Sequence, residues 1–195
     1  MMTSTRLLGA VGATLALFWF GCSEAVPPAS QGAFIAEFRQ PDGGKCKVAS
    51  HPIKVGSATV KDLFDLRTDS VDGTTVQCTV TEASGGYTVK GLIDDGDGNQ
   101  IDFTIPSISA NASKAAPVKG NVGVRSPKTG DTYRSPGNDC SFWLERDNGA
   151  KGQVGSGILW VSFECPKIVN LGEASECNID GTTFSSVIAM QNCDQ

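Results

Sequence analysis

VQCTVTEASGGYTVKGLIDDGDGNQIDFTI, residues 76–105, is the stretch of sequence that decides the fold. Apolar and polar residues alternate in three short runs, and turn-forming residues lie between the runs. Alternation with a period of two is typical of half-buried β-strands. We therefore predict strands joined by tight turns, with the following side chains pointing inward: Val76, Cys78, Val80, Ile101, Phe103 and Ile105.

The rest of the chain repeats this pattern of short alternating runs and glycine-rich turns. Four dipeptides tolerate the positive φ angles of tight turns, and they are Asp42-Gly43, Asp72-Gly73, Asn148-Gly149 and Asp180-Gly181. Only residues 58–66, ATVKDLFDL, have apolar spacing that suits a helical turn or two. The sequence therefore predicts an all-β fold, a single antiparallel β-sandwich of jelly-roll type with at most one or two short helical turns.

The N-terminal residues have the composition of an export signal. Arg6 precedes an uncharged apolar run of about fourteen residues, which is too short to cross a bilayer comfortably, and Gly21 and Cys22 follow it. We expect residues 1–21 to be removed. Residues 22–32 contain proline, serine, alanine and glycine without apolar periodicity and are expected to form a tether. Residues 33–195 are long enough for one domain with a substantial core.

The chain has seven cysteines, an odd number that needs an explanation in an exported protein. An even six remain when Cys22 is set aside, and they fit three disulfides of the kind that persist in oxidising compartments. Six cysteines allow 15 pairings, and the sequence alone does not choose among them. We favour pairs that are close in sequence: Cys46 with Cys78, Cys140 with Cys165, and Cys177 with Cys193.

The stretch ending in Gly21-Cys22 resembles the lipobox of bacterial lipoproteins, although Trp19 and Phe20 stand where that motif has a leucine and a small residue. The resemblance implies that Cys22 is acylated, becomes the new N-terminus and anchors the protein in the membrane. Ser23, in the place of an aspartate, implies sorting to the outer membrane. The alternative is an ordinary secretory signal, which would leave Cys22 unpaired or bonded to another molecule.

The C-terminal part resembles a group of uncharacterised lipoproteins of myxobacterial type. The resemblance rests on GILWVSFECPKIVN, residues 157–170, and on CNIDGTTFSSVIAMQNC, residues 177–193. It implies a secreted, disulfide-bonded, β-rich domain, and it brings no activity or catalytic residues with it.

The charge of the chain argues against nucleic acid as a partner. Removal of residues 1–21 takes away Arg6 alone, which leaves 15 basic against 21 acidic residues and a net charge of −6. Such a surface repels nucleic acid and anionic headgroups. We therefore expect contact with the membrane to be made through the N-terminal lipid.

The acidic stretch DDGDGNQID, residues 94–102, raises the question of calcium because its oxygen donors alternate as in an EF-hand loop. With Asp95 as the first position, the required glycine is Gln100 and the required glutamate is Pro106, so the motif fails. A plain hairpin turn is the favoured interpretation. The weaker alternative is a calcium site formed by Asp95, Asp97, Asn99 and Asp102.

The sequence offers little for catalysis. His51 is the only histidine, and a single imidazole without a free cysteine does not complete a zinc site or a nucleophile–base pair in the sequence. We expect no cofactor and no enzymatic activity. A hydrolase whose carboxylates meet only in the fold is a further alternative.

Two tryptophans are candidates for ligand binding. In CSFWLE and GILWVSFEC, Trp143 and Trp160 lie on the strand faces opposite the cysteines. A Cys140–Cys165 disulfide would place Trp143 opposite Ser162 and make the two indoles diagonal neighbours. Together with Tyr133 they would form an aromatic surface for a sugar or a protein partner, unless a second layer or a loop buries them.

These features together predict a cell-envelope lipoprotein whose domain acts as a non-enzymatic binding or structural module. The alternative is a carbohydrate-binding module that uses exposed tryptophans.

Overall fold

The computed structural model describes residues 27–57, 65–144, 151–170, 172–182 and 186–195. These residues form a 13-stranded sheet and contain no helix. Every pairing between two of the strands is antiparallel. The prediction of an all-β antiparallel fold is therefore confirmed. The described residues therefore contain no helix that is long and apolar enough to span a membrane.

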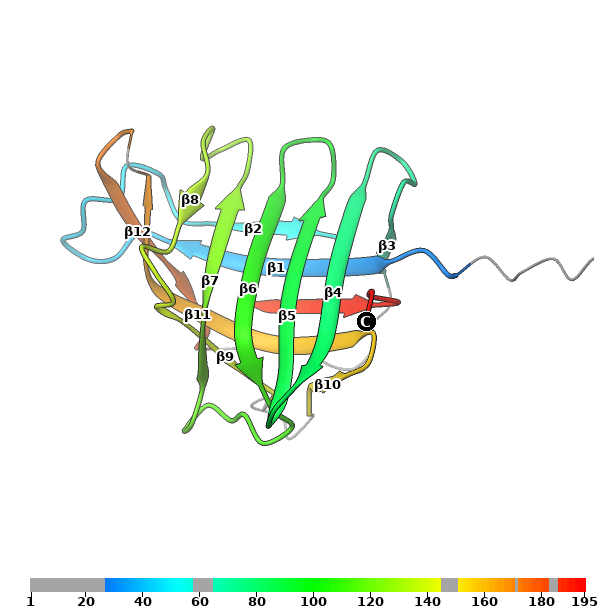
Figure 1. Cartoon of the computed structure of the whole chain (residues 1–195). Helices are drawn as coiled ribbons and strands as arrows, with labels where there is room; N and C mark the ends of the chain where they lie inside the picture. The colour runs from blue at the N-terminus through cyan, green and yellow to red at the C-terminus, as the bar shows by residue number, and fades with distance from the viewer. Residues whose placement is uncertain (1–26, 58–64, 145–150, 171, 183–185) are drawn as a thin grey trace, which may run out of the picture.

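Four long strands form the front layer in Figure 1. They are β4 (Thr75–Ala83), β5 (Gly86–Asp94), β6 (Gln100–Ile108) and β7 (Val118–Arg125). The first three are the strands and turns that the opening stretch of sequence predicts. The side chains predicted to point inward from β4 and β6 are all buried.

A second layer lies behind the first, and its strands cross the front strands at a steep angle (Figure 1). It consists mainly of β1 (Gln31–Arg39), β2 (His51–Val55), β11 (Ile158–Asn170) and β13 (Val187–Gln191). At one end β12 (Ser175–Asp180) pairs with both β1 and β11. The short strands are β3 (Arg67–Thr68), β8 (Tyr133–Arg134), β9 (Cys140–Trp143) and β10 (Gln153–Gly155).

The two layers belong to one continuous sheet. The strand order is β12-β1-β13-β11-β8-β7-β6-β5-β4. β8 and β9 each pair with β7 on one side and with β11 on the other, so the hydrogen bonding passes from the front layer to the rear layer there. β4 ends this path, and Asp194 near the C-terminus forms a parallel bridge with Thr79 on β4.

Aromatic and branched side chains fill the space between the layers. The ring of Phe142 on β9 lies 5.8 Å from the ring of Phe163 on β11 and 6.4 Å from that of Phe103 on β6. Phe34 and Phe38 of β1 are fully buried in the same cluster. Burial of each such side chain contributes about 1.5–3 kcal/mol to folding, so this cluster holds the two layers together.

All six predicted disulfide cysteines pair with one another. The Cys140–Cys165 disulfide is present as predicted, with 4.2 Å between the Cα atoms. The other two predicted pairs are wrong, because the bonds join Cys46 to Cys177 and Cys78 to Cys193. The fold overrides closeness in sequence here: β12 runs beside the segment around Cys46, and the C-terminal segment runs beside β4.

Some of the predicted segments lie wholly or partly outside the described residues. Residues 1–26, which contain the predicted signal, Cys22 and the first part of the tether, are among these. Gln31 and Gly32, at the end of the predicted tether, already belong to β1. Residues 58–64 of the predicted helical turn also lie outside the described residues, and Asp65 forms an antiparallel bridge with Ser57.

Candidate functional site

The outer face of the front layer carries a regular array of polar side chains. Because successive residues of a strand point to opposite faces, the inward Val76, Cys78 and Val80 leave Gln77 and Thr79 pointing outward. The register then aligns side chains across the strands. Thr79 lies opposite Lys90, which lies opposite Thr104. In the next row Gln77 lies opposite Leu92, which lies opposite Asp102.

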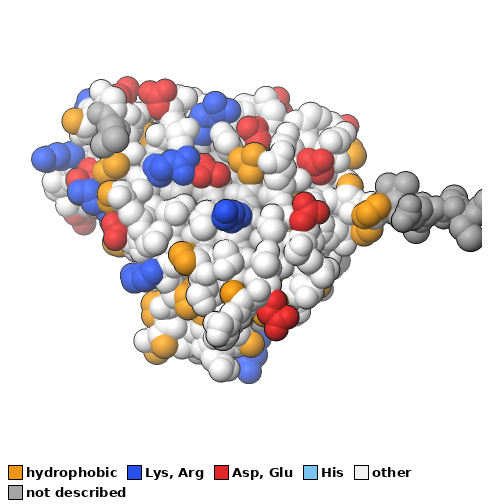
Figure 2. All heavy atoms as spheres, viewed as in Figure 1, with side chains coloured by type: hydrophobic (Ala, Val, Ile, Leu, Met, Phe, Trp, Pro, Cys, Tyr) orange, Lys and Arg blue, Asp and Glu red, His pale blue; other side chains and the backbone are white. Residues whose placement is uncertain are grey.

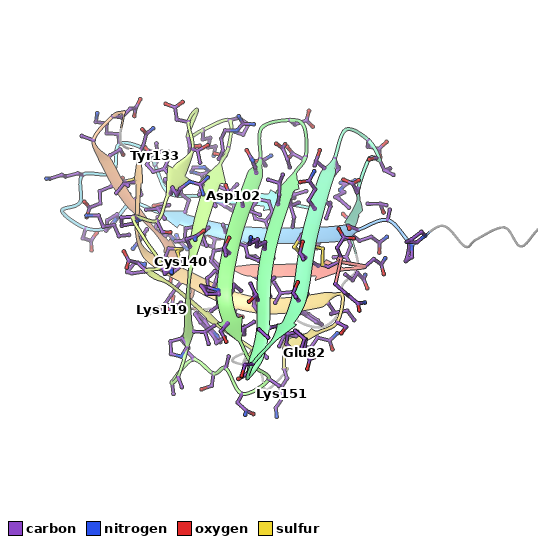
Figure 3. All side chains as sticks on the ribbon, viewed as in Figure 1. Glu82, Asp102, Lys119, Tyr133, Cys140 and Lys151 are labelled. Atoms are coloured by element: carbon purple, nitrogen blue, oxygen red, sulfur yellow. A yellow bond between two sulfur atoms is a disulfide. The ribbon has the colours of Figure 1, made fainter. Side chains whose placement is uncertain are left out.

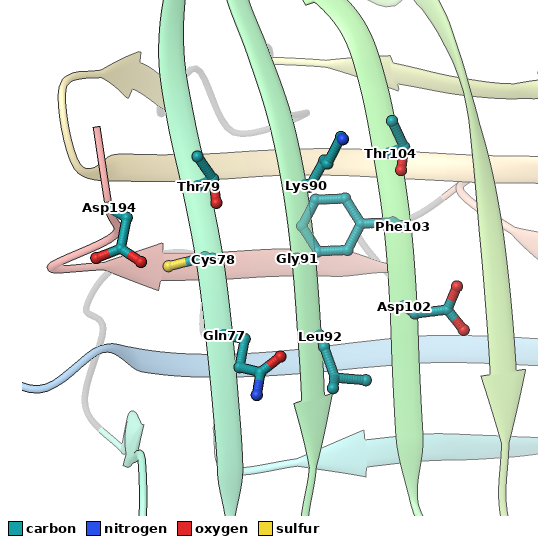
Figure 4. Close-up of a pocket in the computed structure, with 10 residues that line it drawn as sticks. All are labelled: Gln77, Cys78, Thr79, Lys90, Gly91, Leu92, Asp102, Phe103, Thr104 and Asp194. Atoms are coloured by element: carbon teal, nitrogen blue, oxygen red, sulfur yellow. The ribbon is translucent and has the colours of Figure 1, made fainter.

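This array surrounds a shallow hollow of about 570 Å³ (Figure 4). Uncharged polar groups and backbone dominate the middle of this side of the molecule, and charged side chains are scattered over it (Figure 2). The hollow spans β4, β5 and β6 and reaches the C-terminal segment. Its lining residues are Gln77, Cys78, Thr79, Lys90, Gly91, Leu92, Asp102, Phe103, Thr104 and Asp194.

An ion pair borders the hollow on the side of β7. Arg134 donates hydrogen bonds from both terminal nitrogens to the two carboxylate oxygens of Asp102, at 2.5 and 2.8 Å. This bond raises the pKa of Arg134 above its ordinary value. Gly123 lies beneath the pair, and a Cβ there would come within 2.5 Å of an oxygen of Asp102. Because Gly123 has no side chain, Arg134 on β8 reaches across β7 to Asp102 on β6. This contact holds the carboxylate of Asp102, which is labelled in Figure 3, on the outer face.

Several hydrogen-bonding groups of this face have no partner within the described part of the chain. The side chains of Gln77, Thr79, Lys90 and Thr104 make no hydrogen bond or ion pair there. Amide, hydroxyl and ammonium groups at such positions are available to a ligand. The hollow therefore combines hydrogen-bonding groups that have no partner within the described residues with the apolar side chain of Leu92.

The predicted aromatic surface does not form in the structure. The register places Trp143 opposite Ser162, as the disulfide-based argument predicts. However, Trp143 is only 3 % exposed, and the ammonium of Lys114 lies 5.5 Å from its ring centre. Trp160 is half-buried and packs against a small apolar cluster with Ala33. The indole of Trp143 is therefore not displayed for stacking with a sugar, and that of Trp160 is only partly exposed.

Tyr133 is the third predicted aromatic residue, and it lies in the core. It is completely buried, and its ring meets the ring of Phe38 edge-on at 5.1 Å. Its hydroxyl group is buried without a hydrogen-bond partner in the described structure. Its position on β8, between the two layers, excludes a role in an exposed binding surface.

The four predicted calcium donors are not brought together. Asp95 accepts the N–H groups of Asp97 and Asn99 with one oxygen, each at 2.9 Å, and the side-chain amide of Asn99 with the other at 2.7 Å. These bonds build the turn between β5 and β6. Asp102 lies on β6 and binds Arg134 instead. Within the described ranges, no three His, Cys, Asp or Glu residues are placed to hold a metal ion.

Four acidic residues line one other hollow, of about 480 Å³, at the end of the front layer. A carboxylate oxygen of Asp65 there lies 4.0 Å from a terminal nitrogen of Arg67. Both carboxylate oxygens of Asp95 accept hydrogen bonds within the turn between β5 and β6. Asp72 and Asp97 complete the acidic lining. Lys54, Ser57 and Thr74 line the same hollow, and none of their side chains is hydrogen-bonded or ion-paired to these acids within the described residues.

His51 forms a buried hydrogen-bonded pair with Ser126. Its Nδ1 lies 2.8 Å from the carbonyl oxygen of Ala49, which only accepts, so in neutral His51 the proton is on Nδ1. Its Nε2 then accepts the hydroxyl of Ser126 at 2.9 Å. The Ser126 oxygen also accepts the N–H of Thr129, and Ser126 is only 3 % exposed. The pair therefore fixes the turn after β7 and does not present a nucleophile.

Of the outer-face residues, the sequence singled out only Asp102, as a calcium donor, and it did not single out Gln77, Thr79, Lys90 or Thr104. Alternation alone predicts which side chains of β4 and β6 point outward, but every strand of a two-layer fold has such residues. Only the topology tells which outward face remains uncovered and that Arg134 reaches Asp102 across Gly123.

Comparison with known proteins adds no relative to this description. No family model matches the chain, and no curated protein or solved structure matches it.

Proposed function

We propose that this chain is a lipid-anchored protein of the cell envelope whose domain binds a hydroxyl-rich ligand, a glycan, on the outer face of β4, β5 and β6. Cys22 would carry the lipid, and Ser23 favours the outer membrane. The domain would act as a binding module without catalysis.

The pairing of the other cysteines supports the anchor. Six cysteines form three disulfides among themselves, so none of them is left to bond with Cys22 in the same chain. β1 begins nine residues after Cys22. An extended segment of that length reaches about 30 Å, so the domain would stay close to the membrane surface.

Mass spectrometry of the membrane-extracted protein tests the anchor. We expect the N-terminus to be Cys22 with added acyl mass, and we expect Cys22→Ser to move the protein out of the membrane fraction. A mature chain that begins elsewhere, or that has no acyl mass, would overturn this part of the proposal. The Cys140→Ser/Cys165→Ser variant controls for general effects of cysteine loss.

One observation carries the binding function. Gln77, Thr79 and Thr104 border the hollow of about 570 Å³ and make no hydrogen bond within the described residues. The volume lies in the range of ligand sites. A ligand rich in hydroxyl groups can donate to and accept from amides and hydroxyls, whereas an apolar ligand would leave them unsatisfied. Asp102, held in place by Arg134, adds a fixed acceptor.

Two competing functions have less support. A carbohydrate-binding module that stacks sugars on tryptophan needs exposed indoles, and Trp143 and Tyr133 are buried. A hydrolase needs an accessible nucleophile or an acid pair, and the His51–Ser126 pair is buried within the fold.

Affinity electrophoresis through gels that contain soluble polysaccharides measures this binding and tests the function. We expect Gln77→Ala to weaken binding by about 3- to 10-fold, the effect of one lost hydrogen bond. Gln153→Ala on β10 is the matched control, because Gln153 is an exposed strand glutamine away from the hollow. Lack of binding to every polysaccharide, or equal loss in both variants, would contradict the proposal.

A further inference from the structure

Asp94 and Asp102 on the outer face of the front layer are each ion-paired, whereas Lys90 on β5 has no acidic partner within the described residues. Arg134 binds Asp102, and Arg125 lies 3.9 Å from Asp94. Lys90 is exposed at the centre of the face, and within the described part of the chain its ammonium has no hydrogen bond or ion pair. A positive charge is therefore available in the middle of the proposed glycan site.

Hydroxyl groups flank this ammonium on both sides. Thr79 and Thr104 are the cross-strand neighbours of Lys90, and cross-strand neighbours have Cβ atoms about 4.5–5.5 Å apart. An ammonium with three N–H donors, between two hydroxyls, suits an anionic oxygen more than a neutral one. Figure 4 shows these three side chains on neighbouring strands.

The next row of side chains suits the body of a sugar ring. Leu92 lies two residues from Lys90 on the same strand face, with Gln77 and Asp102 on its two sides. The apolar side chain can pack against the C–H groups of a sugar, and the amide and the carboxylate can bind hydroxyls. A sugar ring over Leu92 would thus have its substituent near Lys90.

We infer that the glycan recognised by this face carries a uronic-acid carboxylate that binds the ammonium of Lys90. This inference rests on the proposed function. Because the chain has a net negative charge, a polymer with a charge on every sugar would be repelled at long range. The ligand that fits is a mostly neutral glycan with isolated carboxylates.

The test uses the mature full-length chain in detergent and a panel of polysaccharides whose repeat contains one uronic acid among neutral sugars. Xanthan, gellan and glucuronoxylan are each compared with their carboxyl-reduced forms, and dextran and xylan serve as neutral polymers. We expect at least one acidic polymer to bind about 1.5- to 5-fold more tightly than its reduced form, as for one exposed charge pair.

Variants then assign the preference to Lys90. Lys90→Gln should abolish the difference between the acidic and reduced polymers, while Lys90→Arg should keep the difference. Lys54→Gln on β2 is the matched control, an exposed strand lysine of the rear layer that should change nothing.

The possible failures are distinguishable. Equal binding of acidic and reduced polymers, binding of neutral polymers alone, or an unchanged preference in Lys90→Gln would overturn the inference and leave the proposed glycan binding intact. Binding to no polymer of either kind would overturn the proposed function itself.

Discussion

Cys78 on β4 is bonded to Cys193, and the next residue, Asp194, bridges to Thr79 on the outer edge of the same strand. Asp194 also accepts the N–H of Val80 and donates its own N–H to the carbonyl of Cys78. The C-terminal segment therefore covers part of the last edge of the sheet, where unpaired N–H and C=O groups would otherwise invite another strand.

Loss of this disulfide should destabilise the domain and loosen its edge. For Cys78→Ser/Cys193→Ser we expect the free energy of unfolding to fall by about 2–4 kcal/mol, because the bond closes a sequence separation of 115 residues. Urea unfolding followed by circular dichroism measures the change. An unchanged unfolding midpoint would show that the bond contributes nothing to stability.

Gly91 on β5 should not tolerate a side chain. A Cβ there would lie 2.4 Å from the ring of Phe103 and 2.7 Å from the sulfur of Met190. We expect Gly91→Ala to lower the free energy of unfolding by about 1–3 kcal/mol through overpacking. Gly155→Ala on β10 is the control, since nothing lies within 4 Å of its Cβ. Equal urea-unfolding midpoints for Gly91→Ala and Gly155→Ala would contradict the close packing of Phe103 and Met190 around Gly91.

Asp69 should make stability depend on pH. Its carboxylate accepts the N–H of Val76 at 2.7 Å and the hydroxyl of Ser70 at 2.9 Å, and these bonds lower the pKa of Asp69 below its ordinary 3.8. A carboxyl group with a lowered pKa in the folded state stabilises the fold above its unfolded pKa, and this contribution is lost as the pH falls through the folded pKa.

Between about pH 5 and pH 2, wild type should therefore lose more stability than Asp69→Asn. Urea titrations across this range measure the difference. Asp72→Asn, in the same loop, should follow wild type, because within the described chain Asp72 accepts no N–H from a strand. Parallel curves for wild type and Asp69→Asn would count against this role.

The two tryptophans should differ in access to a neutral quencher. In the mature chain Trp160→Phe leaves Trp143 as the only reporter, and Trp143→Phe leaves Trp160. We expect acrylamide to quench Trp143 less than Trp160, because Trp143 is 3 % exposed and Trp160 is half-buried. Strong quenching of Trp143 in the folded protein would restore the aromatic surface as a binding site.

The front layer was predictable because its signals are local. Alternation in residues 76–80 and 101–105 and the turns between the runs are properties of neighbouring residues, and the structure confirms them. Alternation together with the predicted Cys140–Cys165 disulfide placed Trp143 opposite Ser162. Whether the strand face that carries Trp143 is exposed to solvent depends on segments that are distant in the sequence and pack over it. No local sequence pattern predicts where those segments lie.

The disulfides and the site show the same limit. Cys140 and Cys165 lie on strands that are neighbours in the sheet, so their pairing could be inferred from two short motifs. The partner of Cys46 is 131 residues away and depends on the placement of β12. Likewise, Lys90 becomes a candidate ligand-binding residue only when the fold shows that Asp102 and Asp94 are already paired with arginines.

The placement of β1 has a mechanical consequence. β13 and β12 pair with one edge of this strand, and β3 and β2 pair with the other, from Gln31 onward. A pull on the chain ahead of Gln31 acts along the strand axis and loads these hydrogen bonds in shear, so that many must break together rather than one after another. A domain held by its N-terminal end while it grips a ligand would therefore resist extension at the point where the tension enters.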